Sequence, residues 1–169
     1  GCMEGGSVTN CKNDNNSVES NQQNNPYTDC IGGVIGCVNV ADGATVQINN
    51  LSNNAAVLGN ENIGGVIGFV TATNSSTSLT INNLTMELMV ITGERSVGGI
   101  IGGCTQPLTL TNAVNRSAID AQGSDRRDFG GIIGAISTEG SVVLDNCQSG
   151  KNKMGAQPDP SQKYIDAGA

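Results

Sequence analysis

The residues best suited to catalysis lie in one charged stretch. Asp125 and Asp128 flank Arg126 and Arg127, and Asp120 lies upstream in the same segment. Two carboxylates can share the roles of general acid and general base. The chain contains no His, which excludes Ser–His and Cys–His nucleophile systems. Because carboxylates in a corner loop are most often simply solvated, we predict no catalytic residue and a non-enzymatic protein.

Metal and cofactor sites are not predicted. Asp14, Glu19 and Asp29 share a polar stretch that could meet a calcium ion, but no D-x-D-x-D-G loop is present. A plain surface loop is therefore the favoured interpretation. The cysteines show no C-x-x-C spacing, which argues against zinc in a chain without His. They are Cys2, Cys11, Cys30, Cys37, Cys104 and Cys147.

A five-residue pattern, Gly-Gly-Val/Ile-Ile-Gly, recurs four times and sets the architecture. We call it the glycine word. Its first glycines lie 32, 34 and 32 residues apart, which indicates one structural unit copied in series. The glycines allow sharp bends and close backbone packing. They are Gly32, Gly33, Gly36, Gly64, Gly65, Gly68, Gly98, Gly99, Gly102, Gly130, Gly131 and Gly134.

The units predict an all-β parallel β-helix, or solenoid. Each offers three short strand segments, such as the alternating Thr45–Ile48. We expect about five right-handed coils of about 32 residues each in a single domain. A β-sandwich is the alternative, but it needs no repeated word. The coils are expected at 1–31 (partial), 32–63, 64–97, 98–129 and 130–167. Because both ends fall within a repeat, we expect a segment of a longer array.

Asparagine recurs at one place in every unit, just after the alternating strand. Stacked Asn side chains can hydrogen-bond along the axis of a solenoid, and Asn tolerates left-handed backbone geometry at a corner. We predict a structural asparagine ladder. Its members are Asn10, Asn50, Asn83, Asn112 and Asn146.

One disulfide is considered. Cys2 and Cys37 occupy equivalent positions in adjacent coils. Stacking places their Cα atoms about 4.8 Å apart, which is within the range that disulfides span. Two small buried apolar residues at these positions are the interpretation that we favour over the bond.

The glycine word resembles the GLUG motif, a short repeat found in arrays in bacterial surface proteins and in Bacteroidetes adhesin-like proteins and lipoproteins. Ile or Val stands here where the motif's name has Leu. The resemblance covers residues 1–168 through the spacing of the words. It implies an extracellular, repetitive β scaffold and no particular catalytic residue.

These observations predict a non-enzymatic module on the cell surface or outside the cell that acts as an adhesin-like binding or display scaffold. Host protein or glycan is the expected partner, through long loops at 12–29 and 148–163. The alternatives are a polysaccharide lyase or hydrolase of β-helix type and a purely structural stalk. The net charge of −7 argues against nucleic acid, and no apolar run is long enough to span a membrane. The oligomeric state is left open.

Overall fold

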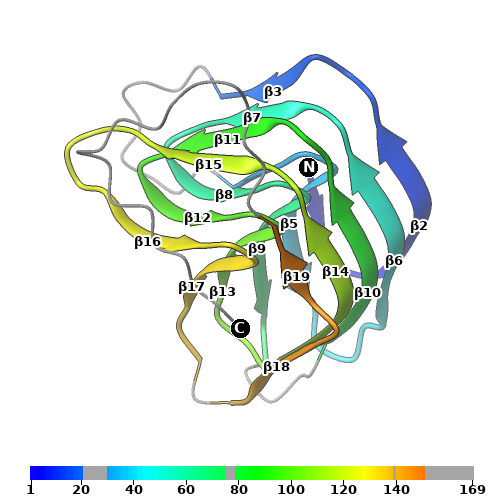
Figure 1. Ribbon diagram of the computed structural model, residues 1–169. Helices are drawn as coiled ribbons and strands as arrows, with labels where there is room; N and C mark the ends of the chain where they lie inside the picture. The colour runs from blue at the N-terminus through cyan, green and yellow to red at the C-terminus, as the bar shows by residue number, and fades with distance from the viewer. Residues whose placement is uncertain (21–29, 75–78, 139, 151–169) are drawn as a thin grey trace.

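The protein is an all-β solenoid of parallel strands (Figure 1). The computed structural model describes residues 1–20, 30–74, 79–138 and 140–150. Within these ranges there is no helix, and so none that could cross a membrane. The chain makes about four turns of about 33 residues each, and β17, β18 and β19 begin another. The predicted fold class is confirmed, with four full turns where about five were expected.

Each full turn contributes one strand to each of four parallel sheets. Sheet A contains β1 (Cys2–Met3), β5 (Ile35–Val40), β9 (Ile67–Ala72), β13 (Ile101–Cys104) and β17 (Ile133–Ile136). Sheet B contains β2 (Gly6–Asn13), β6 (Val46–Asn53), β10 (Leu79–Met86), β14 (Leu108–Asn115), β18 (Val142–Asp145) and β19 (Gln148–Ser149). Sheet C contains β3 (Ser17–Glu19), β7 (Ala56–Leu58), β11 (Val90–Gly93) and β15 (Ala118–Ala121). Sheet D contains β4 (Ile31–Gly32), β8 (Glu61–Gly64), β12 (Arg95–Gly98) and β16 (Arg127–Gly130).

The prediction of three strands per turn was wrong, because a fourth strand precedes each glycine word. The word itself is the sharp corner between sheets D and A. Strand β8 ends at Gly64 and β9 begins at Ile67, so the chain folds back within two residues. A Cβ on Gly64 would overlap the carbonyl oxygen of Ile67. Only glycine fits a corner this tight, which explains why the word is repeated.

Matching positions of successive turns stack in columns. In the glycine word, the backbone nitrogen of Val34 donates to the Val66 oxygen at 3.0 Å, and that of Val66 donates to Ile100 at 3.0 Å. Ile100 continues the column by donating to Ile132 at 2.9 Å. Equivalent residues therefore contact equivalent residues along the axis, as the repeat predicts.

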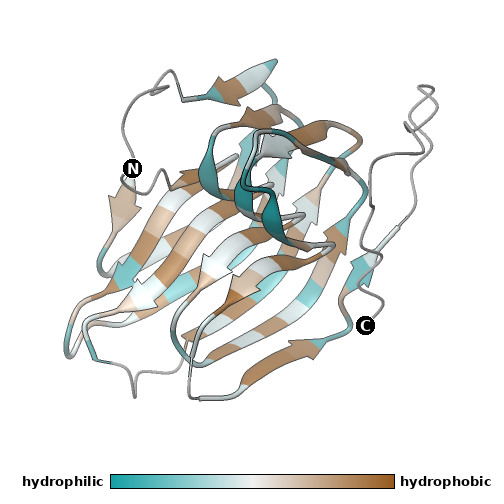
Figure 2. Ribbon diagram, turned by 90° about the vertical axis from the view of Figure 1, so that its left-hand side faces the viewer, coloured by the Kyte–Doolittle hydropathy of each residue, from teal (hydrophilic) through white to brown (hydrophobic). Residues whose placement is uncertain are grey.

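The core consists of aliphatic side chains that point inward from the sheets. Along the long strands, hydrophobic and polar residues alternate (Figure 2). In the middle turns the inward side chains of Ile67, Ile81 and Leu110 are fully buried. One turn alone cannot cover these side chains, so each turn depends on its neighbours for burial. At the end of the array Val143 and Leu144 are exposed.

The two segments predicted as long contact loops are partly strands. Lys12 and Asn13 continue β2, and residues 17–19 form β3 through the pairing of Val18 with Val57. Gln148 and Ser149 form β19 against β14. Strand pairing with the next turn overrides the polar composition that suggested loops. Residues 21–29 and 151–163 lie outside the described part of the chain.

Candidate binding surface

The charged corner singled out for acid–base chemistry is a network of ion pairs. The Asp125 carboxylate lies 3.3 Å from Arg127 Nη1 and 3.7 Å from Arg95 Nη1. Arg95 in turn contacts Glu61 at 3.0 Å across the pairing of β8 with β12. Asp120 accepts a hydrogen bond from the Gln122 side chain instead, and Asp128 lies 3.9 Å from Arg127 Nε.

Glu94 belongs to the same corner. Its carboxylate accepts the backbone N–H of Asp125, and this hydrogen bond holds the pKa of Glu94 below its usual range. A carboxylate kept ionised is a poor proton donor. The arrangement therefore suits bracing of the 123–125 turn better than proton transfer.

The region considered for calcium is divided in the structure. Asp14 forms an exposed ion pair with Lys12 at 2.9 Å, and Glu19 lies on β3. Asp29 falls outside the described residues. Among those that are described, no group of three acidic, His or Cys residues could hold a metal ion.

The five asparagines of the ladder form one exposed column on sheet B. All five have positive φ, between 51° and 59°. Asn50 Nδ2 donates to Asn10 Oδ1 at 2.7 Å, and Asn83 Nδ2 donates to Asn50 Oδ1 at 2.9 Å. Asn146 Nδ2 donates to Asn112 Oδ1 at 2.6 Å. Three of the four steps of the column are therefore joined directly by its own side chains.

The third step of the ladder has a different partner. Asn112 Nδ2 donates to the Oδ1 of Asn82, at 2.9 Å, rather than to the adjacent Asn83. Thr111 also donates to Asn82 Oδ1, at 2.8 Å. Asn82 itself donates to Asn49 Oδ1 at 3.3 Å. A second row thus joins the ladder through short polar side chains.

A second asparagine column, inside the solenoid, was missed by sequence reasoning. Asn53 is fully buried, and its Nδ2 donates to the carbonyl oxygen of Gly65 at 2.7 Å. Asn13 donates to Gly33 in the same way at 2.8 Å. These amides hydrogen-bond to the backbone of the glycine words on the inner side of the solenoid. The signal was present in the sequence, since each inner asparagine lies three residues after a ladder asparagine. The inner asparagines are Asn13, Asn53 and Asn115.

The ladder borders a broad neutral surface, which we call the polar face. Its side chains project outward from sheet B, since residues that alternate with them, such as Ile48, Ile81 and Leu110, are buried in the core. It consists of Ser7, Thr9, Asn10, Gln47, Asn49, Asn50, Thr80, Asn82, Asn83, Thr109, Thr111 and Asn112. None of these side chains carries a charge.

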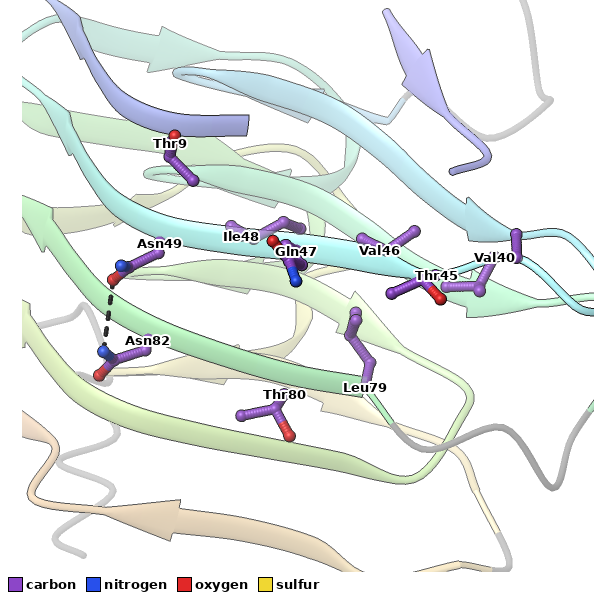
Figure 3. Close-up of a pocket in the computed structure, with 11 residues that line it drawn as sticks. Thr9, Val40, Thr45, Val46, Gln47, Ile48, Asn49, Leu79, Thr80 and Asn82 are labelled. Atoms are coloured by element: carbon purple, nitrogen blue, oxygen red, sulfur yellow. Dashed lines mark hydrogen bonds between the residues drawn. The ribbon is translucent and has the colours of Figure 1, made fainter. Parts of the chain in front are cut away.

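A shallow groove of about 590 Å³ lies on this part of sheet B (Figure 3). Its polar lining comes from β2, β6, β10 and Thr45, the residue before β6, and none of the described residues that line it is charged. Thr9, Gln47 and Thr80 make no side-chain hydrogen bond to the described part of the protein, so their polar groups are available to a ligand. The polar residues that line it are Thr9, Thr45, Gln47, Asn49, Thr80 and Asn82.

All six cysteines are free thiols. Cys2 and Cys37 are paired in register on β1 and β5, as expected from their equivalent positions. The bond considered between them is nevertheless absent. Side chains at paired positions of parallel strands project side by side, so their Cβ atoms keep about the strand spacing of 4.8 Å. A disulfide requires Cβ atoms about 3.5–4.5 Å apart.

Comparisons of the chain with protein families, with curated proteins and with solved structures give no match. The class that the structure defines is a parallel β-solenoid of stacked turns with a neutral polar face on one sheet. What this class does must be argued from its surfaces.

Proposed function

We propose that the protein is a non-enzymatic, adhesin-like module that binds a neutral glycan through the polar face. The observation that carries the proposal is the groove on this face, where the uncharged polar side chains of Thr9, Gln47 and Thr80 have no side-chain hydrogen bond within the described protein and lie beside apolar lining residues. Such groups match the hydroxyls of a sugar, because each can donate or accept a hydrogen bond.

The charge of the molecule is consistent with this ligand class. The chain carries a net charge of −7, yet no charged residue of the described part of the chain lines the groove. An anionic polysaccharide would be repelled by the overall charge and would find no arginine or lysine in the groove. A neutral polymer avoids both penalties.

The repeated architecture suits an extended ligand. Polar groups recur on successive strands at about 4.8 Å, so a chain lying along the axis meets a similar set of groups on each turn. Repetition multiplies individually weak contacts, which is how a surface without aromatic side chains can gain avidity. We place the module on the cell surface or outside the cell, in keeping with the resemblance of its glycine word to surface-protein repeats.

A glycan microarray tests the proposal directly. We expect the wild type to bind neutral glycans, and the double variant Gln47→Ala, Thr80→Ala to lose most of that binding. Thr92→Ala removes a hydroxyl from β11 on sheet C and serves as the matched control. An array on which the wild type binds nothing, or binds only anionic glycans, would contradict the proposed ligand.

The proposal that the protein is not an enzyme is tested by a separate experiment. The wild type is incubated with neutral and acidic polysaccharides, and new chain ends are measured. Turnover by the wild type that is lost in Asp125→Asn would refute this part and favour a lyase or hydrolase.

A further inference from the structure

Three of the six cysteines gather at one corner of the first turns. Cys2 lies on β1 and Cys37 lies on β5, its partner in sheet A. Cys30 immediately precedes β4 in sheet D. The glycine word between Cys30 and Cys37 folds the chain back on itself. The carbonyl oxygen of Cys30 would lie only 2.8 Å from a Cβ on Gly36, the residue before Cys37.

The thiol of Cys37 lies between the other two. Cys2 is its register partner on β1, and the carbonyl oxygen of Cys30 lies against Gly36, the residue before it. The contact with Cys30, together with burial, raises the pKa of the Cys37 thiol well above its usual range. Cys2 is exposed and the other two are half-buried, so small reagents can reach the cluster.

The two neighbours of Cys37 differ in geometry. Cys2 is its partner along the parallel pairing, where side chains project side by side and are too far apart to bond. Cys30 immediately precedes β4, on the other side of the corner. In the next turns the side chain at its position reaches the column of Cys37, since Asn62 Oδ1 would lie 2.9 Å from a Cβ on Gly103. Side chains that face each other across a corner can converge, so this pair needs the smaller movement to form a bond.

Among the described corners, cysteine occupies both of these positions only in the first turns. In later turns the position of Cys37 is taken by Phe69, Gly103 and Ala135. The position of Cys30, one residue before the paired isoleucines of sheet D, is taken in the next turn by Asn62. Both positions therefore hold cysteine at the same corner and at no other described one.

We propose that Cys30 and Cys37 are a reversible dithiol–disulfide site whose oxidant is a small-molecule disulfide such as oxidised glutathione. One protein thiolate attacks the small disulfide, forms a mixed disulfide and releases one small thiolate. The second protein thiolate then displaces the second small thiolate. One protein S–S bond forms, two electrons pass to the small disulfide, and the two thiol protons end on the released thiols. This inference is independent of the proposed glycan binding.

The bond would fasten sheet D to sheet A at the first corner. Cys2 keeps its place beside Cys37 on β1 and stays a free thiol. The site would then be strengthened under oxidising conditions and released under reducing ones.

Thiol counting by intact mass tests the proposal. The full chain is treated with oxidised glutathione, unfolded at low pH and alkylated. We expect wild type, Cys2→Ser and the control Cys147→Ser each to lose two hydrogens and two alkylatable thiols. Cys37→Ser should form no internal bond, so that any glutathione attached to Cys30 stays as an added mass, and Cys30→Ser should react at least about tenfold more slowly, through the poorly placed Cys2.

Two outcomes would overturn the proposal. The first is a wild-type chain that keeps all six thiols. The second is loss of the reaction in Cys2→Ser together with an unchanged rate in Cys30→Ser, which would assign the bond to Cys2 and Cys37. Circular dichroism of each reduced variant shows whether the substitution has disturbed the fold and so separates a lost thiol from a lost structure.

Discussion

The two asparagine columns of this solenoid use the same amide group in opposite environments. The ladder asparagines are exposed and bond mainly to one another along the axis, as Asn83 does to Asn50. The inner asparagines bond across the turn to the backbone, as Asn53 does to Gly65. Only three residues separate the two columns in each turn.

The difference lies in what each amide satisfies. An exposed ladder amide replaces a hydrogen bond that water could also make, so its net contribution is small. Asn53 instead satisfies buried backbone groups that water does not reach. Its Nδ2 also donates to the Ala55 oxygen at 3.0 Å, and its Oδ1 accepts the Ala55 N–H at 3.1 Å. The inner column should therefore carry more of the stability.

Removal of an inner asparagine is expected to have the largest effect. Asn53→Ala leaves the Gly65 carbonyl and both backbone groups of Ala55 without this partner. We expect the free energy of unfolding to fall by about 2–4 kcal/mol, measured by urea denaturation. Asn54→Ala, at the adjacent exposed position, is the matched control and should change it by less than about 0.5 kcal/mol. Equal effects at the two positions would remove the distinction between buried and exposed amides.

The third turn offers a natural exception. Met86 occupies the inner position there and is fully buried. Met86→Ala should cost about 2–4 kcal/mol, because it leaves a cavity. In Met86→Asn the new amide can donate to the Gly99 oxygen, as Asn53 does to Gly65, so a loss below about 1.5 kcal/mol is expected. If Asn is as damaging as Ala in urea denaturation, the position does not share the inner-column geometry.

The sequence revealed the outer features of the molecule better than the inner ones. The glycine words and the ladder repeat in every turn, so their stacking could be predicted. The inner column is interrupted by Met86, which hides its periodicity. The strands of sheet D were missed because Asn62, Ser96 and Asp128 have positive φ there, which breaks the two-residue alternation that marks a strand.

The contact surface predicted from the sequence, the segments 12–29 and 148–163, stays a prediction. The polar face is a different candidate, and it consists of strand residues. Alternation shows which residues point outward but not that those of several turns form one groove. The disulfide between Cys2 and Cys37 rests on the Cα spacing alone, and both cysteines are free in the structure. The side-by-side projection of side chains at paired positions of parallel strands disfavours the bond.

Removing a ladder asparagine should lower the free energy of unfolding less than removing an inner one. Its effect through backbone geometry can be separated from its effect through hydrogen bonds. Asn50 has φ of 56°, which alanine adopts only at a cost. Asn50→Ala should lower the free energy of unfolding by about 1–2 kcal/mol through this backbone strain and two lost hydrogen bonds. Asn50→Gly loses the same bonds but keeps the backbone geometry, so it should cost about 1 kcal/mol less than the alanine variant. Equal urea midpoints for the two variants would show that φ is not the controlling factor.

The buried side-chain amide of Gln106 extends the comparison, and its replacement should change the free energy of unfolding least. Gln106 is 1% exposed, and neither its Nε2 nor its Oε1 has a hydrogen-bond partner in the described protein. An unpaired buried amide opposes folding, whereas a paired one supports it. Gln106→Leu, which is similar in size and apolar, should therefore raise the free energy of unfolding by about 0.5–1 kcal/mol, opposite in sign to Asn53→Ala. Gln106→Glu is the contrasting variant, since it buries a charge at the same position and should destabilise the protein. Destabilisation by leucine would show that the Gln106 amide has a partner, such as an internal water molecule, and that it belongs with the inner column.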